Sequence, residues 1–428
     1  MNPLPVLLLL VFQLFTIIPG SLSAQRSHPT LNSEAPLPAA NRIQVYLPLL
    51  KGKRVGLFAN PTSLVGNKHL VDTLLALGVH ITRVFGPEHG FRGKADAGAT
   101  VDNYLDAATG IPVISLFGKK RKPDAEDLKE VDVLLFDIQD VGTRFYTYIS
   151  SLQEFMEAAF ENSKPLMILD RPNPNGFYVD GPVLDTAFRS FVGMQPIPIV
   201  YGMTMAEYAF MIAGEHWLSP KANEKYAYYQ RARNSPDTAF HFQVIKCANY
   251  THKSFYQLPV KPSPNLPDMA SVYWYPGTCL FEGTILSEGR GTEHPFAEFG
   301  HPSLPDSLFA FTPVSREGAN QPKLMNQVCH GWNLSGKPDE VLKKINGHIP
   351  ISYLLEAYRL FPDKSGFFLP AKNQDPRLNA FNRLAGNSHL MEQIQSGLSE
   401  DAIRKSWEKD IQAFKKIRKK YLLYPDFE

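Results

Sequence analysis

Short apolar segments alternate with helix-like segments along the first half of the chain. The apolar segments lie at 54–59, 80–86, 111–118, 131–137, 165–170 and 197–202. Each is a nearly continuous hydrophobic run, which is typical of strands that are buried on both faces. Strands of this kind, separated by helices, predict a parallel sheet covered by helices on both sides. We therefore predict an α/β fold, with a Rossmann-like parallel-sheet domain over residues 43–243.

The helices between these strands have recognisable boundaries. Residues 68–78 keep a helical pattern that ends at Gly78, a residue suited to the position just after a helix. Residues 148–159 place apolar side chains at the spacing of one helix face. Thr204 and Glu207 have the spacing of a capping box, which predicts the start of another helix.

The pattern changes from about residue 244. Prolines cluster at 258–267, a strand-like segment follows at 271–284, and long helical segments close the chain. The last helix is predicted to begin near Ser399, and its basic run at 415–420 is interpreted as a solvated face. We predict a second, smaller α+β domain over residues 244–428.

The N-terminus has the features of an export signal. An apolar run from Val6 to Ile18 is followed by Pro19 and then by small residues that end at Ala24. This order is typical of a signal peptide, here residues 1–24. A transmembrane anchor is the alternative, but a span takes about 20 apolar residues and this run is shorter. We predict an exported protein, periplasmic or extracellular, with no transmembrane segment in the mature chain.

Composition narrows the class of function. Hydrophobic residues make up 44% of the chain and charged residues 20%, which suffices for a full core. The net charge of +2 offers no basic surplus, so we predict no nucleic-acid partner. Cys247, Cys279 and Cys329 are too few for a disulfide framework and form no C-x-x-C pair, so we interpret them as small buried residues.

Polar residues gather where the predicted strands end, which is where open parallel sheets bind ligands. The strand ends read "GPEHGFRG", "FDIQDVGTRFYTY", "LDRPNPNG" and "VYGMT", and the second domain adds "KPSPNLP" and "FEGTILSEGRGTEHPF". From these segments we predict the following substrate-binding residues: His89, Arg92, Asp137, Gln139, Asp140, Arg144, Tyr146, Asp170, Arg171, Asn173, Asn175, Asn265 and Arg290.

Carboxylates and amides beside aromatic rings suit a sugar, because they bind its hydroxyls while the rings cover its apolar face. Glycoside hydrolysis usually needs a protonated carboxyl and a second group across the ring. We predict Glu88 as the acid, since a turn at a cleft wall can be partly desolvated. Glu288 and Glu293 are the first candidates for the second group, followed by Asp137 and Asp140.

Plainer interpretations stay open for the same residues. Glu88 and His89 can belong to a solvated turn, Arg92 to a surface ion pair and Asp137 to a helix N-cap. In the same way, the two glutamates of the second domain can serve only to bind hydroxyls.

Several other chemistries are disfavoured by spacing. "FANPTSLVG" follows the first strand where a dinucleotide site would have G-x-G-x-x-G, and the chain has no G-x-S-x-G serine motif. No standard zinc spacing relates the histidines and glutamates of the candidate segments, which are His89, Glu293, His294, Glu298 and His301. We therefore predict no metal site and no cofactor.

The chain resembles a known family in an ordered series of motifs. "FANPTSLVG", "VFGPEHGFRG", "FDIQDVGTRFYTYISSL", "LDRPNPNG", "GPVLD", "PIPIVYGMTMAEYA", "KPSPNLP" and "SEGRGTEHPF" are similar to the pattern of the NamZ family of exo-β-N-acetylmuramidases. The resemblance runs from about residue 43 to the C-terminus. It implies a Rossmann-like domain and a smaller C-terminal domain with a cleft between them. It also implies removal of N-acetylmuramic acid (MurNAc) from the non-reducing ends of peptidoglycan fragments such as MurNAc-GlcNAc, in cell-wall turnover and recycling. The expected catalytic glutamate falls on Glu88.

That substrate gives arginines a role, because MurNAc carries a lactyl carboxylate that N-acetylglucosamine (GlcNAc) lacks. A guanidinium binds a carboxylate through two parallel hydrogen bonds. The candidates are Arg144, Arg171 and Arg290, with Arg144 first because it lies in the loop "DVGTR". The alternative is that Arg144 pairs with Asp137 or Asp140 to hold this loop. A non-catalytic sugar-binding protein and a metal-dependent cell-wall hydrolase are the alternative functions.

Overall fold

The computed structural model describes residue 1 and residues 34–88, 90–92, 102–232 and 241–428. His89 and, beyond Met1, the predicted signal peptide lie outside the described residues. Residues 35–428 form one compact unit, so the predicted domain boundary at residue 243 stays a prediction. No helix within the described ranges has the length and apolar character needed to cross a membrane.

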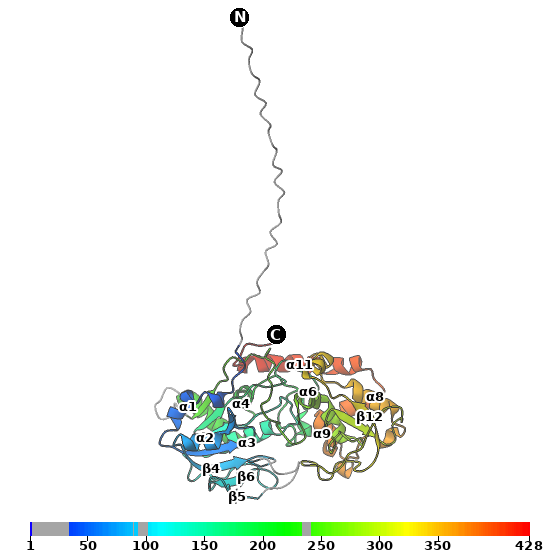
Figure 1. The fold of residues 1–428 in the computed structure, drawn as a ribbon. Helices are drawn as coiled ribbons and strands as arrows, with labels where there is room; N and C mark the ends of the chain where they lie inside the picture. Colours follow the sequence, from blue (N-terminus) through cyan, green and yellow to red (C-terminus); the bar gives the residue numbers. More distant parts are fainter. Residues whose placement is uncertain (2–33, 89, 93–101, 233–240) are drawn as a thin grey trace. The chain divides into compact units, whose positions relative to one another are not determined.

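A seven-stranded sheet organises the first part of the chain (Figure 1). Its strands, in spatial order, are β5 (Tyr104–Leu105), β6 (Pro112–Ser115), β4 (His80–Gly86), β1 (Arg54–Ala59), β7 (Val133–Asp137), β8 (Leu166–Leu169) and β9 (Phe242–Ile245). All neighbours pair in parallel except β5, which runs antiparallel to β6. A small antiparallel pair, β2 (Leu64–Val65) and β3 (Lys68–His69), stands apart. The predicted parallel sheet is confirmed.

Helices cover both faces of this sheet because alternate strand residues point to opposite sides. Leu57 and Leu135 pack in one apolar cluster with α1 (Ile43–Leu50) and α2 (Leu70–Ala76). Phe58 and Phe136 belong to the other cluster, which contains α3 (Tyr148–Glu161), α4 (Met205–Gly214) and α5 (Pro220–Ala232). The predicted capping box at Thr204 and Glu207 begins α4.

The predicted strand at 197–202 is wrong. Its backbone makes only isolated bridges within the described residues, from Val200 to Thr143 and to Asp180. Pro198 lies inside the segment and has no N–H to donate, which removes it from the interior of a sheet. The hydrophobic run is buried as an irregular segment instead.

The second part of the chain builds a small antiparallel sheet and six helices. The sheet has the order β10 (Glu298–His301), β12 (Cys329–Asn333), β11 (Phe309–Phe311). The helices are α6 (Met269–Thr278), α7 (Pro338–Ile345), α8 (Ser352–Leu360), α9 (Ala380–Ala385), α10 (His389–Gln395) and α11 (Glu400–Arg418). The predicted fold class, a Rossmann-like parallel sheet followed by a smaller α+β region, is confirmed.

The strand-like segment at 271–284 is a correction, because it folds as α6 and a short 3-10 turn. Asp268 caps the helix by accepting a hydrogen bond from Ser271 N at 2.8 Å. Every residue of α6 is buried. A helix that is buried on all sides has no polar stripe, so its aromatic and β-branched residues resemble a strand in sequence.

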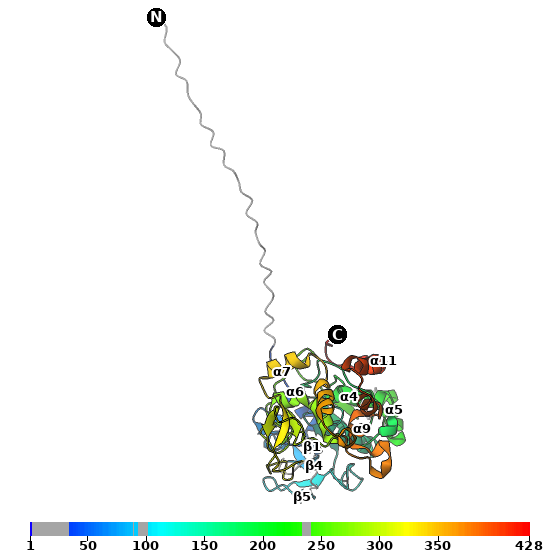
Figure 2. The same cartoon turned by 90° about the vertical axis from the view of Figure 1, so that its right-hand side faces the viewer.

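Helix α11 lies along the upper side of the described unit in both views (Figures 1 and 2). It begins after Ser399, as predicted. Arg404 pairs with Asp180 at 2.8 Å, and Arg418 donates to Gly202 O, so the last helix is tied to loops of the first part. The basic run at 415–420 was predicted to face solvent. Arg418 in that run does not, since it is buried and pairs with Asp426.

Candidate active site

The turn after β4 delivers Glu88 to a cavity. Gly90 closes the turn by donating its N–H to Pro87 O at 3.0 Å, with a φ of +75° that glycine adopts without strain. Glu88 is half-buried, and its side chain lines the cavity. Because β4 lies between β1 and β6, the glutamate stands at the end of an inner strand of the sheet.

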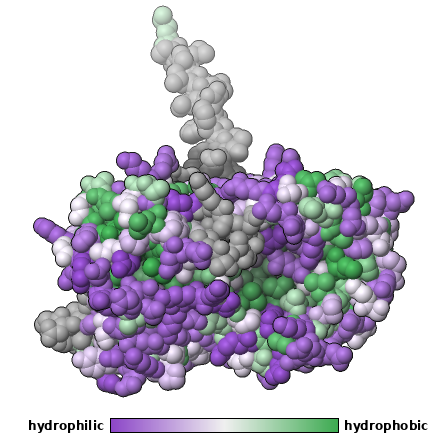
Figure 3. Space-filling model, turned by 90° about the horizontal axis from the view of Figure 1, so that it is seen from below, coloured by the Kyte–Doolittle hydropathy of each residue, from purple (hydrophilic) through white to green (hydrophobic). Residues whose placement is uncertain are grey.

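The cavity is built from segments far apart in the sequence. Beside Glu88 it is lined by Phe145, Tyr146, Thr147, Tyr148, Ser263, Leu266, Tyr275, Arg290 and Phe296. Its volume is about 70 Å³. Figure 3 shows a hollow with hydrophobic residues near the middle of one largely hydrophilic face.

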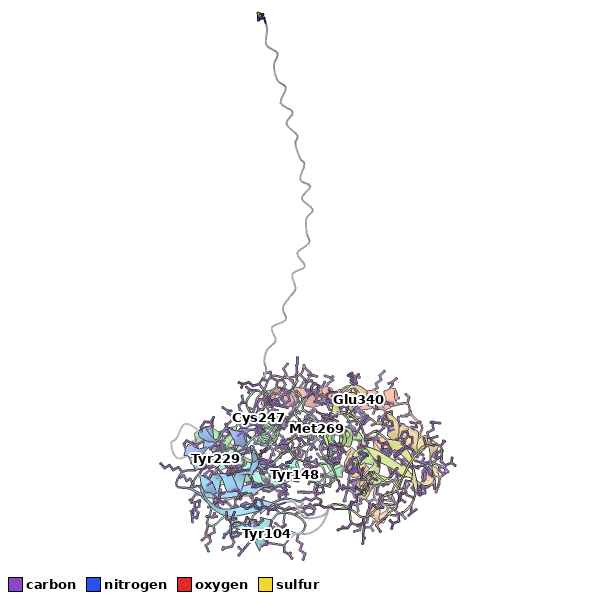
Figure 4. The ribbon with its side chains drawn as sticks, in the orientation of Figure 1. Tyr104, Tyr148, Tyr229, Cys247, Met269 and Glu340 are labelled. Atoms are coloured by element: carbon purple, nitrogen blue, oxygen red, sulfur yellow. The ribbon has the colours of Figure 1, made fainter. Side chains whose placement is uncertain are left out.

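Aromatic rings pack edge to face around this cavity. Tyr146 meets Tyr148 with ring centroids 4.8 Å apart, and Tyr275 meets Phe296 at the same separation. The Tyr146 hydroxyl donates to Pro262 O at 2.8 Å, which fixes its ring. Figure 4 shows Tyr148 near the middle of the described unit. These contacts make a rigid, mostly apolar wall.

Tyr148 is a hydroxyl of the cavity lining that senses the charge of Glu88. Its oxygen accepts a hydrogen bond from Asn60 Nδ2 at 2.9 Å, which leaves its proton available for donation. Burial, and then the negative charge of Glu88, raise the pKa of the Tyr148 hydroxyl well above its ordinary value. Tyr148 therefore stays protonated beside the carboxylate.

Arg290 brings a fixed positive charge to the same cavity. It lies 2.7 Å from Glu282 and 3.3 Å from Glu288, and its guanidinium stacks over Phe296 at 4.9 Å. Burial opposes its charge, but the two glutamates outweigh that effect and raise the pKa of the guanidinium. The neighbouring Gly289 has a φ of +81°, and a Cβ there would lie 2.3 Å from a backbone oxygen, so the turn requires glycine.

The carboxylates predicted at the other strand ends are engaged inside the protein. Asp137 forms a buried two-bond ion pair with Arg171, at 2.6 and 2.8 Å. Asp140 accepts hydrogen bonds from Gly142 N and the Tyr201 hydroxyl, and burial raises its pKa to about 6. Neither carboxylate lines the Glu88 cavity in the described part of the chain. Asp137, Asp140 and Arg171 thus have structural roles here, and their predicted roles toward a substrate stay predictions.

Arg144, the first candidate for the lactyl carboxylate, is likewise held inside the protein. Its side chain is fully buried and donates to the carbonyl oxygens of Pro182, Ile197 and Leu384 at 2.7–2.8 Å. Burial lowers the pKa of the guanidinium to about 9. Arg144 therefore joins three backbone segments rather than gripping a ligand, and it pairs with neither aspartate considered in the sequence.

The remaining strand-end residues are buried with protein partners as well. Asp170 accepts a hydrogen bond from the Tyr424 hydroxyl at 2.6 Å. Three amide side chains donate to backbone oxygens, and these are Gln139, Asn173 and Asn175. They are not on the lining of the Glu88 cavity in the described part of the chain, and their assignment to the substrate stays a prediction.

The other candidates lie near the cavity's loops but face elsewhere. Glu288 is buried against Arg290 and Lys323. Glu293 is 74% exposed and, with Asn265, lines a separate cavity of about 540 Å³. Arg92 pairs with Asp72 and Asp106. Of the predicted residues, the Glu88 cavity thus gathers Glu88, Tyr146 and Arg290 within the described ranges.

Sequence reasoning missed part of the lining. Phe145, Thr147, Ser263, Leu266 and Phe296 were not predicted, although each lies within a motif that was singled out. The available signal was their place in these motifs, beside residues that were chosen. Their hydrophobic or hydroxyl character alone does not separate them from core residues.

Family models match nearly the whole compact unit. The N-terminal model of exo-β-N-acetylmuramidase NamZ matches residues 55–270, and the C-terminal model of the same family matches residues 273–424. The chain belongs to the NamZ family. Glu88 lies within the first NamZ model and Arg290 within the second, so the cavity draws on both family regions.

Individual relatives agree with the NamZ assignment. The chain is 39% identical over 400 residues to the peptidoglycan β-N-acetylmuramidase NamZ of Bacillus subtilis (strain 168), covering 89% of each sequence. It is also similar to two crystal structures of DUF1343 family proteins from Bacteroides fragilis. One is 43% identical with a TM-score of 0.78, covering 92% of this chain and all of the other. The second is 28% identical with a TM-score of 0.70, covering 91% and 99%.

Proposed function

We propose that this protein is an exo-β-N-acetylmuramidase that hydrolyses the bond of a non-reducing terminal MurNAc in peptidoglycan fragments such as MurNAc-GlcNAc. The observation that carries the proposal is the cavity where Glu88 faces tyrosine rings and Arg290. Membership of the NamZ family supports it, as does the 39% identity to a relative named as a peptidoglycan β-N-acetylmuramidase. Cell-wall turnover and recycling is the matching role.

In this proposal Glu88 is the general acid. Its carboxyl donates a proton to the glycosidic oxygen as the bond to the MurNAc anomeric carbon breaks, and a water molecule forms the new bond to that carbon and gives up one proton. Tyr148, held by Asn60, lines the same cavity and keeps its proton near the charge of Glu88. The rings of Tyr146 and Tyr275 cover the apolar face of the sugar.

Arg290 supplies the choice of substrate. A guanidinium that lines the cavity can bind the lactyl carboxylate of MurNAc, a group that GlcNAc does not carry. A charge-assisted hydrogen bond to a group that only one of two substrates carries discriminates between them more strongly than a small difference in shape. Arg290 therefore takes the role that sequence reasoning gave first to Arg144.

The test is a pair of chromogenic glycosides that differ only in the lactyl group. The MurNAc glycoside should release its aglycone and the GlcNAc glycoside much more slowly. Release of MurNAc from MurNAc-GlcNAc, followed by mass spectrometry, tests the natural bond. Binding of both sugars without any release of aglycone would refute hydrolysis and favour a sugar-binding protein.

We also propose that the protein is exported, on the strength of the signal-peptide pattern at residues 1–24. N-terminal sequencing of the protein from its own cells should begin at Gln25. A mature chain that still begins at Met1 would contradict export by cleavage.

A further inference from the structure

Four charged side chains form one cluster at the wall of the cavity: Glu282, Glu288, Arg290 and Lys323. Arg290 lies 2.7 Å from a Glu282 oxygen and 3.3 Å from a Glu288 oxygen. The other Glu288 oxygen lies 3.1 Å from Lys323 Nζ. Two positive and two negative charges give a cluster with no net charge. Arg290 is its member on the cavity lining in the described part of the chain.

Lys323 is held in place independently of the glutamate. Its ammonium lies 3.0–3.2 Å from four backbone carbonyl oxygens, which belong to Phe281, Glu282, Thr284 and Leu286. An ammonium has three protons, so these oxygens and Glu288 share them. The lysine therefore has two separable roles, which are to fasten this turn and to set the charge beside Glu288.

Glu88 lines the same cavity and is the same in every variant described below, and the other ionisable groups facing the cluster are uncharged at neutral pH. Two such groups interact electrostatically with the cluster. The Tyr275 hydroxyl shifts the pKa of Arg290. The Cys279 thiol interacts with Tyr275, and Glu282 shifts the pKa of that thiol. Burial is the main reason why the pKa of the tyrosine and that of the thiol lie well above their ordinary values. The differences in charge that the variants create beside Arg290 are thus set by Glu288 and Lys323.

We propose that Lys323 is a specificity-determining residue, whose charge offsets Glu288 so that Arg290 presents a net attraction to the carboxylate of MurNAc. Without the lysine, the two glutamates outnumber the arginine and the cluster carries one negative charge. An anionic substrate is then repelled, whereas a neutral GlcNAc glycoside is not. The inference rests on the proposed function of Arg290.

The experiment varies the net charge of the cluster in steps of one unit and measures KM for the matched MurNAc and GlcNAc glycosides. It is done at low salt, where screening is weak. Lys323→Met gives a charge of −1 and Glu288→Gln gives +1. The double variant returns to 0, as in the wild type. We expect KM for the MurNAc glycoside to fall from the −1 to the +1 variant, by about ten-fold for each unit of charge at this partly buried site. Values for the GlcNAc glycoside should stay within about two-fold, because it carries no charge to sense the cluster.

The double variant separates the charge of Lys323 from its carbonyl contacts. It lacks these contacts, just as Lys323→Met does, but its cluster charge is that of the wild type. Recovery of MurNAc preference in the double variant supports the proposal, and a double variant no better than Lys323→Met overturns it. If Lys323→Met does not fold by thermal melting, Glu288→Gln keeps every carbonyl contact and decides alone. An unchanged KM in that variant overturns the proposal. Failure of the proposed function looks different, because the wild type would then release no aglycone.

Discussion

The ends of strands β4 and β8 look alike in sequence but differ in the structure. Each ends in a turn rich in charge and in Gly or Pro. After β4, Glu88 reaches a cavity lined by residues of both parts of the chain. After β8, Asp170 is covered by Tyr424 from the last residues of the chain, and Ala39 donates to its backbone oxygen. One end is a surface for a ligand, and the chain's own termini have closed the other.

The difference shows what polar density at a sheet edge does and does not indicate. It marks where backbone groups need partners and where charges must be paired once they are buried. Either a substrate or another segment of the protein can meet that need. The ion pair of Asp137 and Arg171, at the end of β7, is the second outcome.

The largest expected effect is at the open end. Glu88→Gln should lower kcat by about 10² to 10⁴, because glutamine is nearly isosteric but has no acid proton to give. The melting temperature should not change, since the residue lines a cavity. Steady-state kinetics on the MurNAc glycoside and a thermal melt check both points. Turnover within a few-fold of the wild type would remove Glu88 from the chemistry.

At the end of β7, where Asp137 and Arg171 pair with each other, a substitution should lower the free energy of unfolding instead. Arg171→Met leaves the Asp137 carboxylate buried without its cation, which costs about 3–5 kcal/mol in such pairs. Denaturant unfolding measures it, and adding Asp137→Asn to the same chain should recover part of the loss. If Arg171→Met instead left stability intact and abolished binding of the MurNAc glycoside, the end of β7 would serve the substrate, as we propose for the end of β4.

Two arginines sharpen the same contrast. Arg290→Met should lose about 2–5 kcal/mol of transition-state stabilisation for the MurNAc glycoside, and little for the GlcNAc glycoside. Arg144→Met is the matched control, because it strands three carbonyl oxygens and should lower the melting temperature while leaving the preference between the two sugars unchanged. A preference that followed Arg144 would reverse our assignment.

The smallest effect concerns pH. Burial, with the charge of Glu207, raises the pKa of Asp170 to about 7 in the folded protein, against about 4 when unfolded. Between those values the unfolded chain has lost this proton and the folded one has kept it. Stability therefore falls as pH rises through that range, by at most about 1.4 kcal/mol per pH unit. Asp170→Asn should flatten the decline, and equal slopes in the two proteins would contradict the assignment.

Much of the fold could be predicted because its signals are local. The buried strands β1, β4, β7 and β8 are hydrophobic runs, and the capping box of α4 is a motif of four consecutive residues, 204–207. The errors at 197–202 and at α6 share a cause. Both segments are buried on all sides, so their sequences lack the polar face that distinguishes a strand from a helix or a coil.

The site was predictable only in part. Glu88 and Arg290 stand on turns fixed by glycines, which a sequence reveals. Arg144 stands on a similar turn, yet it is buried by carbonyls from residues 182, 197 and 384. Lys323 contacts four backbone carbonyl oxygens, and no sequence motif predicts these contacts. Partners contributed by distant backbone leave no mark on the local sequence, and they decide which charged residues stay accessible.

The C-terminal segment that closes the β8 end also sets an order of events in biosynthesis. Leu423 donates to Glu207, Tyr424 to Asp170, and Pro425 accepts from His252. A ribosome makes residues 423–425 after every strand of the seven-stranded sheet, so the buried acids of the sheet edge stay uncovered until this segment has been translated. A fusion partner or affinity tag joined directly after Glu428 would be carried next to this closure.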